Sequence, residues 1–138
     1  MSVPKYDRLE SEADFLFFAR SLAIYTRQWT RKLDKSETFT TKVPFCNLSE
    51  EIYHNLRRGN AINYPLNQHE AQIRRDFFLK AKGNLESYSG DIEILKEDKG
   101  VHGFTKEIFF DLSDLLRTEL KLLTGVMKKD RERYKNLP

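Results

Sequence analysis

Apolar residues recur at spacings of three and four in several stretches of the chain, which is the pattern of an amphipathic helix. One stretch begins at Asn67, a residue suited to capping a helix, with Glu70 three residues later in a variant of the capping box. Its seam reads Ala71, Arg74, Phe78, Ala81, Leu85, Tyr88, Ile92 and Leu95. This pattern predicts a helix over residues 67–96, with one guanidinium on its core-facing side.

Three further stretches show the same periodicity. A helix over residues 11–33 is expected from Phe15, Phe18, Leu22, Tyr25 and Trp29, with Ser11 as its cap and Glu12 and Asp14 in its first turn. A helix over residues 44–58 is expected from Phe45, Leu48, Ile52 and Leu56, with Gly59 as a left-handed stop. A helix over residues 105–133, capped by Thr105, is expected from Ile108, Leu112, Leu115, Leu116, Leu123 and Val126 or Met127.

The polar, β-branched run "KSETFTTKVP" separates the first two helices, and only "ETFTTKV" within it alternates with a period of two. No sheet is therefore predicted. At 138 residues the chain is long enough for one core but not for two. The sequence predicts an all-α fold, a single domain over residues 1–138 built as an up-down-up-down four-helix bundle.

Composition points to an ordinary soluble protein. A third of the residues are charged, yet the formal net charge is only +3, which favours solubility and does not by itself indicate nucleic acid. Cys46 is the single cysteine and cannot form an internal disulfide. The N-terminus lacks the apolar core of a signal peptide, and no apolar run approaches the ~20 residues of a membrane span. We expect a cytoplasmic protein without a membrane partner.

The predicted topology concentrates positive charge at one end. It brings together the end of the second helix, the start of the third and the end of the fourth, which carry Arg57, Arg58, Arg74, Arg75, Lys128, Lys129, Arg131 and Arg133. Such a cluster suits phosphate binding, so these residues are the candidate nucleic-acid-binding set. The alternative is a solvated charge pattern that complements helix dipoles. A smaller group is expected at the opposite end, namely Arg27, Arg31, Lys32, Lys35 and Lys42.

Two features of the third helix leave alternatives open. Arg74 can bind a ligand or form an ion pair with the acidic start of the first helix, where Glu10, Glu12 and Asp14 lie. Gly83 and Gly90 point away from the seam, with Ser87 between them. They indicate either a close subunit contact or glycines tolerated on the surface.

Catalytic and metal-binding patterns are lacking in the sequence. The three histidines have no metal-ligand spacing, and "HEAQI" is not the HExxH of zinc proteases. No Cys-x-x-Cys pair, glycine-rich phosphate loop or G-x-S-x-G elbow occurs. The sequence predicts a protein that is not an enzyme and needs no cofactor or metal.

The segment "GNAINYPLNQHEAQIRRDFFLKAKGNLESYSGDIEIL", and "LKAKGNLES" above all, resembles a family of small four-helix-bundle proteins. These are the proteins of intervening sequences in bacterial 23S ribosomal RNA genes and their relatives, the accessory variability determinant proteins of diversity-generating retroelements. The resemblance implies a barrel-shaped, ring-like homopentamer that binds RNA or DNA and associates with a reverse transcriptase during mutagenic, template-RNA-primed cDNA synthesis. The chain departs from the intervening-sequence branch at "HNLRRGNAIN", where its arginines favour the retroelement branch.

The sequence therefore leaves two alternative hypotheses for the function of the protein. The first is a non-enzymatic, nucleic-acid-binding accessory protein of a reverse transcriptase. The second is a protein–protein interaction module of the intervening-sequence branch, whose basic end docks an acidic partner.

Overall fold

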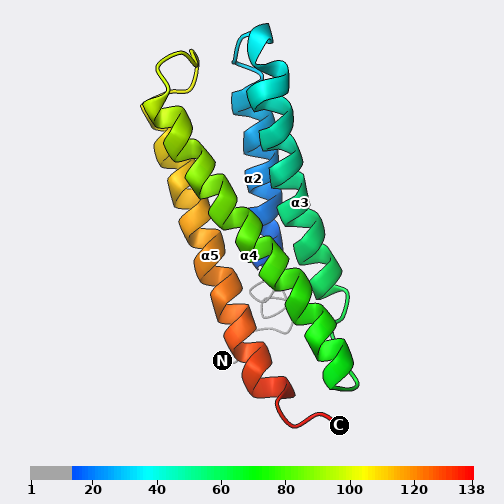
Figure 1. Ribbon diagram of the computed structural model, residues 1–138. Helices are drawn as coiled ribbons and strands as arrows, with labels where there is room; N and C mark the ends of the chain where they lie inside the picture. Colours follow the sequence, from blue (N-terminus) through cyan, green and yellow to red (C-terminus); the bar gives the residue numbers. More distant parts are fainter. Residues whose placement is uncertain (1–13) are drawn as a thin grey trace, which may run out of the picture.

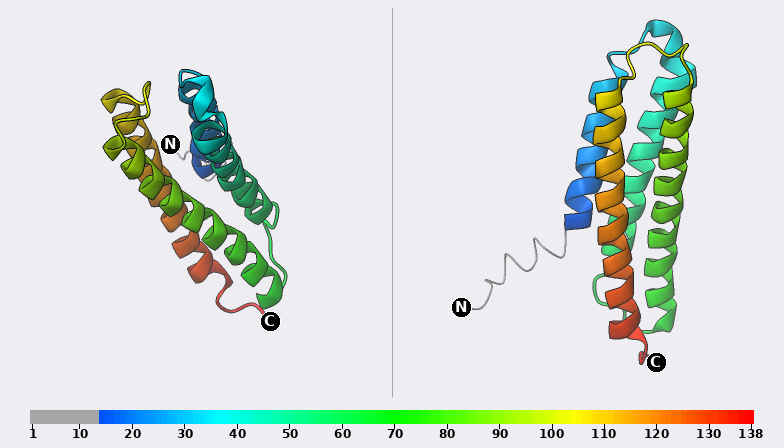
Figure 2. Two further views of the ribbon diagram at one scale, coloured as in Figure 1. Left: turned by 45° about the horizontal axis from the view of Figure 1, so that its top comes forward. Right: turned by 90° about the vertical axis from the view of Figure 1, so that its left-hand side faces the viewer.

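The structure, a computed structural model, describes residues 14–138, and the regular structure in this range is entirely helical. The long helices are α2 (Asp14–Thr30), α3 (Val43–Asn60), α4 (Gln68–Glu97) and α5 (Lys106–Tyr134). Consecutive helices run in opposite directions, and both α2 and α4 pack against α3 and α5 (Figure 1, Figure 2). The predicted up-down-up-down four-helix bundle is confirmed.

Two of the predicted caps are present as expected. The Asn67 side chain accepts a hydrogen bond from the Glu70 amide at 2.9 Å, and the Thr105 hydroxyl accepts one from the Ile108 amide at 3.2 Å. Each satisfies an amide that the first turn of a helix leaves without an intrahelical partner. The predicted cap Ser11 and the acidic Glu12 lie outside the described residues.

The segment between α2 and α3 differs from the prediction. The first helix ends at Thr30 rather than 33, and the run expected to break the pattern forms a 3₁₀ turn at Lys35–Glu37 and a π-helical turn at Thr38–Lys42. Threonine hydroxyls stabilise these turns: Thr38 donates to the Lys35 carbonyl at 2.7 Å and Thr41 donates to the Glu37 carboxylate at 2.6 Å. Local side-chain bonds of this kind outweigh the β propensity of threonine.

The expectation that Gly59 is a left-handed stop is wrong. Gly59 is buried inside α3, which continues to Asn60, and the positive-φ glycine among the described residues is Gly103, with φ at 97°. A Cβ on Gly59 would lie only 2.5 Å from Cε1 of Phe78. The glycine is required because α3 and α4 approach each other closely here.

The predicted seams form the core. On α4 every seam residue from Arg74 to Leu95 is buried, while Ala71 is half-buried. On the other helices most seam residues are buried, namely Phe15, Leu22, Trp29, Phe45, Ile52, Leu56, Ile108, Leu112, Leu116 and Leu123. Phe18, Tyr25, Leu48, Leu115, Val126 and Met127 lie at the edge of the core and are only partly buried.

A buried polar contact joins the diagonal helices α2 and α4. The hydroxyls of Thr26 and Tyr88 lie 2.7 Å apart, and the indole of Trp29 donates to the same Tyr88 oxygen at 3.3 Å. Burial raises the pKa of the Tyr88 hydroxyl, which therefore stays protonated. Because a buried hydroxyl without partners is costly, this contact fixes the register of the two helices.

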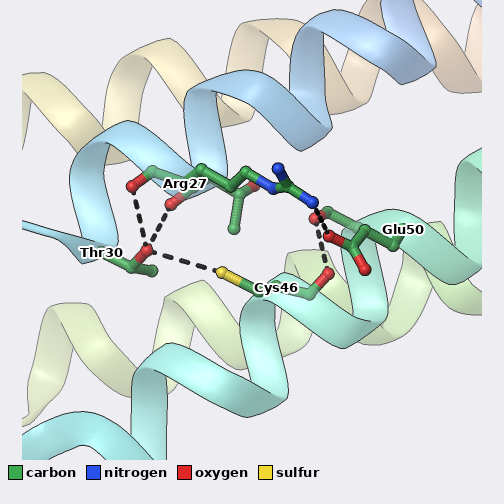
Figure 3. Close-up of polar contacts among 6 residues, drawn as sticks. Arg27, Thr30, Cys46 and Glu50 are labelled. Atoms are coloured by element: carbon green, nitrogen blue, oxygen red, sulfur yellow. Dashed lines mark hydrogen bonds and ion pairs between the residues drawn. The ribbon is translucent and has the colours of Figure 1, made fainter.

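Polar contacts also join α2 to α3 near their connected ends (Figure 3). Arg27 donates to Glu50, and this hydrogen bond raises the pKa of the Arg27 guanidinium. Nearby, the Thr30 hydroxyl lies 3.6 Å from the sulfur of the half-buried Cys46. One member of the second predicted cationic group is thus paired within the fold.

Candidate nucleic-acid interface

Arg74 is a structural residue of the bundle end. Its side chain is 8% exposed, and its Nε and Nη2 donate to the two carboxylate oxygens of Asp130 at 2.7 and 3.2 Å. Its Nη1 donates to the carbonyls of Gly59 and Ile62 at 3.3 and 3.0 Å. Arg74 therefore forms an ion pair with Asp130 of α5. Of the acids expected as its partners, Asp14 makes no such pair, and Glu10 and Glu12 lie outside the described residues.

These contacts close one end of the bundle. The guanidinium bridges α4, α5 and the end of α3. It lies 4.7 Å from the centre of the ring of Phe78, the fully buried apolar residue that follows Arg74 on the α4 seam. A buried arginine with a bidentate partner is well satisfied, which explains how a charged residue occupies a core seam. Four of its five N–H donors are engaged and Asp130 balances its charge, so Arg74 does not count among the cations offered to a phosphate.

The other seven predicted residues are exposed at the same end, where α3 ends, α4 begins and α5 ends (Figure 1). Arg57 lies over the Tyr53 ring at 5.8 Å. Arg58 donates to Asn55 at 3.3 Å and lies 3.6 Å from Glu51, so part of its charge is offset. The remaining members divide between two hollows on either side of α5.

The larger hollow, called the basic groove below, lies on the α2 side of α5 and has a volume of about 1140 Å³. Its α5 wall is a row of residues four apart, Arg117, Lys121, Gly125, Lys129 and Arg133. The opposite wall comes from the start of α2 and from the connection between α3 and α4, with Phe15, Asn60, Asn63 and Tyr64. Tyr64 is 85% exposed.

The smaller hollow lies on the α4 side of α5 and contains Arg75 and Arg131. The structure therefore brings the predicted residues together in pairs: Lys129 with Arg133 in the groove, and Arg75 with Arg131 in the pocket. Lys128 is exposed on α5 and lines neither hollow.

Sequence reasoning missed two cations and an aromatic residue of the groove. Arg117 and Lys121 precede the predicted cluster, but their spacing of four continues through Lys129 and Arg133, which was the available signal. Tyr64 could not be assigned because it lies in a connection without periodicity.

The outer face of α4 carries the two glycines that point away from the core. Gly83 and Gly90 are exposed, and a Cβ built on either meets no atom within 4 Å. Leu79 and Ile94, which are 42% and 66% exposed, lie on either side of them along the helix. This face is open to another molecule.

Within residues 14–138, no cluster of histidine, cysteine, aspartate and glutamate could hold a metal ion. None of the helices in that range combines the length and the apolar character that crossing a membrane requires. The fold and the groove define a helical bundle with a concentration of cations at one end. Comparison with protein-family models, curated proteins and solved structures finds no match.

Proposed function

We propose that the protein is a non-enzymatic nucleic-acid-binding protein that holds the phosphate backbone in the basic groove. The observation that carries the proposal is the row of α5 cations facing an exposed aromatic ring across an elongated hollow. Cations neutralise phosphates and release counterions, and aromatic rings stack on unpaired bases. Both features suit a single strand of RNA or DNA.

Two lysines of the groove have their charge available to a ligand. Lys121 and Lys129 have no hydrogen bond or ion pair within the described part of the chain. Arg117 lies 3.4 Å from Asp114, but both side chains are more than 70% exposed, so the pair is weak. Asp130 also reaches the groove, where Arg74 already neutralises it.

Salt dependence tests the proposal. Binding of labelled single-stranded RNA and DNA, followed by fluorescence anisotropy from about 50 to about 200 mM salt, should weaken steeply. Replacing both Lys121 and Lys129 with alanine should reduce the slope of log K against log salt by about 1 to 2. The matched control is Lys99→Ala, an exposed lysine in the connection at the opposite end, which should leave the slope unchanged.

Two results would count against a nucleic-acid groove. One is the lack of binding at the lowest salt concentration. The other is binding that Lys121→Ala/Lys129→Ala leaves unaltered. Binding of an acidic protein lost in the same variant, without any affinity for RNA or DNA, would favour the interaction module instead.

We further propose that the protein works in the cytoplasm as an accessory protein of a reverse transcriptase of a diversity-generating retroelement, supporting template-RNA-primed mutagenic cDNA synthesis. This part is supported by the resemblance at "LKAKGNLES". We also propose a ring-like homo-oligomer, a pentamer by the resemblance, and the open face of α4 is the surface that suits such a contact. Light scattering that gives a monomer would contradict the ring, and failure to co-purify with a co-expressed reverse transcriptase of a diversity-generating retroelement would contradict the association.

A further inference from the structure

A small pocket separate from the basic groove lies between the first turns of α4 and the last turns of α5. It has a volume of about 160 Å³, and the core residue Phe78 is among the residues that line it. Pockets for drug-sized ligands have volumes of roughly 300–1,000 Å³, so this one suits a single small group. A hollow of this size suits the end of a chain rather than a chain passing through.

Positive charge predominates around this pocket. The pocket is lined by three cations, Arg75, Arg131 and Lys135, and by the single carboxylate of Asp130. Nε and Nη2 of Arg74 already donate hydrogen bonds to that carboxylate. Lys135 lies 3.5 Å from Glu132 in an exposed and therefore weak pair. Arg75 and Arg131 have no hydrogen bond or ion pair with any residue in the range 14–138.

The neutral polar side chains around the pocket already have partners within the fold. Gln68 donates to the carbonyls of Tyr134 and Leu137 at 2.7 and 3.1 Å, and Gln72 donates to Asp76 at 2.8 Å. The Tyr134 hydroxyl donates to the Asn63 carbonyl at 3.2 Å. The two guanidinium groups, beside the ammonium group of Lys135, are therefore the donors that remain for a ligand, and the two guanidinium groups come from different helices.

We propose that this pocket binds the terminal phosphate of a nucleic-acid strand through Arg75 and Arg131. Guanidinium groups bind phosphate oxygens in a bidentate manner, and a terminal phosphate carries a charge of about −1.5 to −2 at neutral pH. An internal phosphodiester carries one charge and has a chain on both sides, so a terminal phosphate matches the small volume and the two guanidinium groups of the pocket better. The inference rests on the proposed function, because the groove on the other side of α5 would hold the rest of the strand.

Strands that differ only at their end provide the test. Fluorescence anisotropy is used to compare single-stranded DNA of one sequence carrying a 5′-phosphate, a 3′-phosphate or hydroxyls at both ends. We expect a strand with a terminal phosphate to bind roughly tenfold more tightly than the strand with two hydroxyl ends, because two charge-assisted contacts are added. Which of the two phosphorylated ends is preferred shows the direction of the strand.

Arg75→Gln/Arg131→Gln should abolish this preference. The affinity for the strand with hydroxyl ends should fall only by the small amount expected from the loss of two surface charges. Both arginines are exposed and unpaired in the described chain, so the variant should fold, as its melting temperature will show. Arg20→Gln is the matched control, since Arg20 is exposed on α2, away from both hollows, and should preserve the preference.

Failure of the pocket and failure of the groove give different results. Equal binding of all three strands by the wild type overturns the pocket and leaves the groove intact. A preference that persists in Arg75→Gln/Arg131→Gln, or that Arg20→Gln also removes, overturns the assignment to these two residues. If no strand binds, both the groove and the terminal-phosphate proposal are refuted. In that case the melting temperature is measured with inorganic phosphate. An increase that occurs only in proteins with both arginines would identify free phosphate as the ligand of the pocket.

Discussion

Glu119 gives the sharpest prediction about the energetics of this bundle. It occupies a core position of α5 between Leu116 and Leu123, its side chain is fully buried, and neither carboxylate oxygen has a hydrogen-bond partner within the described structure. Burial raises its pKa from 4.5 to about 9. Removing a carboxylate from water without a partner is so costly that the folded protein keeps this group protonated at neutral pH.

The stability of the protein should therefore depend on pH in an unusual direction. In the unfolded chain Glu119 ionises near its ordinary pKa of 4.5, whereas the folded chain retains the proton up to about pH 9. The unfolded state thus binds fewer protons between these values, and the free energy of unfolding should fall by about 1.4 kcal/mol per pH unit as the pH rises. At pH 7, about 2.5 units above the unfolded pKa, the accumulated loss is about 3 kcal/mol.

Glu119→Gln isolates this effect because glutamine has nearly the same shape and does not ionise. Urea unfolding followed by circular dichroism should show the variant gaining on the wild type from about pH 5 to about pH 8, with a difference that grows by about 1.4 kcal/mol per unit. Glu119→Leu should in addition relieve the burial of an unpartnered polar group, by about 1–3 kcal/mol. Glu86→Gln is the matched control, an exposed glutamate of α4, and should not change the pH dependence.

The reasoning is refuted if the difference between wild type and Glu119→Gln stays constant over this pH range. A constant difference would mean that Glu119 is ionised in both the folded and the unfolded chain over this range and is therefore hydrated or paired in the folded protein.

Two further predictions concern the basic end. Gly59→Ala should destabilise the protein by about 1–3 kcal/mol in urea unfolding, because the new methyl group collides with the fully buried ring of Phe78. Gly83→Ala, whose methyl group meets no atom, should stabilise the protein by about 0.5–1 kcal/mol. Equal effects of the two substitutions would contradict the close approach of α3 and α4. Arg74→Ala should cost about 3–5 kcal/mol by leaving Asp130, whose side chain is only 15% exposed, without its partner, and Arg74→Met/Asp130→Leu should recover most of that loss. A loss below about 1 kcal/mol would show an exposed pair instead.

Much of this fold could be predicted because its determinants are local. A seam spaced three and four apart and a capping residue lie within a few positions of one another, so the helix starting at Asn67 and the one starting at Thr105 were predicted to within one residue. The turns at residues 35–42 were missed because bonds from threonine hydroxyls determine them rather than side-chain periodicity. The role of Gly59 was missed because it depends on Phe78 of another helix.

The candidate site could be predicted in part for the same reason. The topology alone predicted that the cations lie at one end, but the contacts that each cation makes depend on the register between helices. Asp130, the partner of Arg74, lies 56 positions away in the sequence, and no local pattern distinguishes it from the other acids of the chain. Register likewise decides that Arg75 and Arg131 share a pocket.

Two acids on the same face of α5 show how position within the bundle determines the charge of a group. Glu119 and Asp130 both interrupt the apolar seam of the helix, about three turns apart. Asp130 lies at the bundle end, where its carboxylate accepts two hydrogen bonds from the guanidinium of Arg74. Glu119 lies among apolar residues without a partner in the described structure, so it remains neutral. The pairing at Asp130 removes one cation and one anion from the basic end together, and the affinity for phosphate must therefore come from the exposed cations of α5 and from Arg75. Removal of the whole pair in Arg74→Met/Asp130→Leu should accordingly leave the salt dependence of binding by the folded protein unchanged. Loss of Lys121 and Lys129 should instead reduce that salt dependence and leave the stability unchanged.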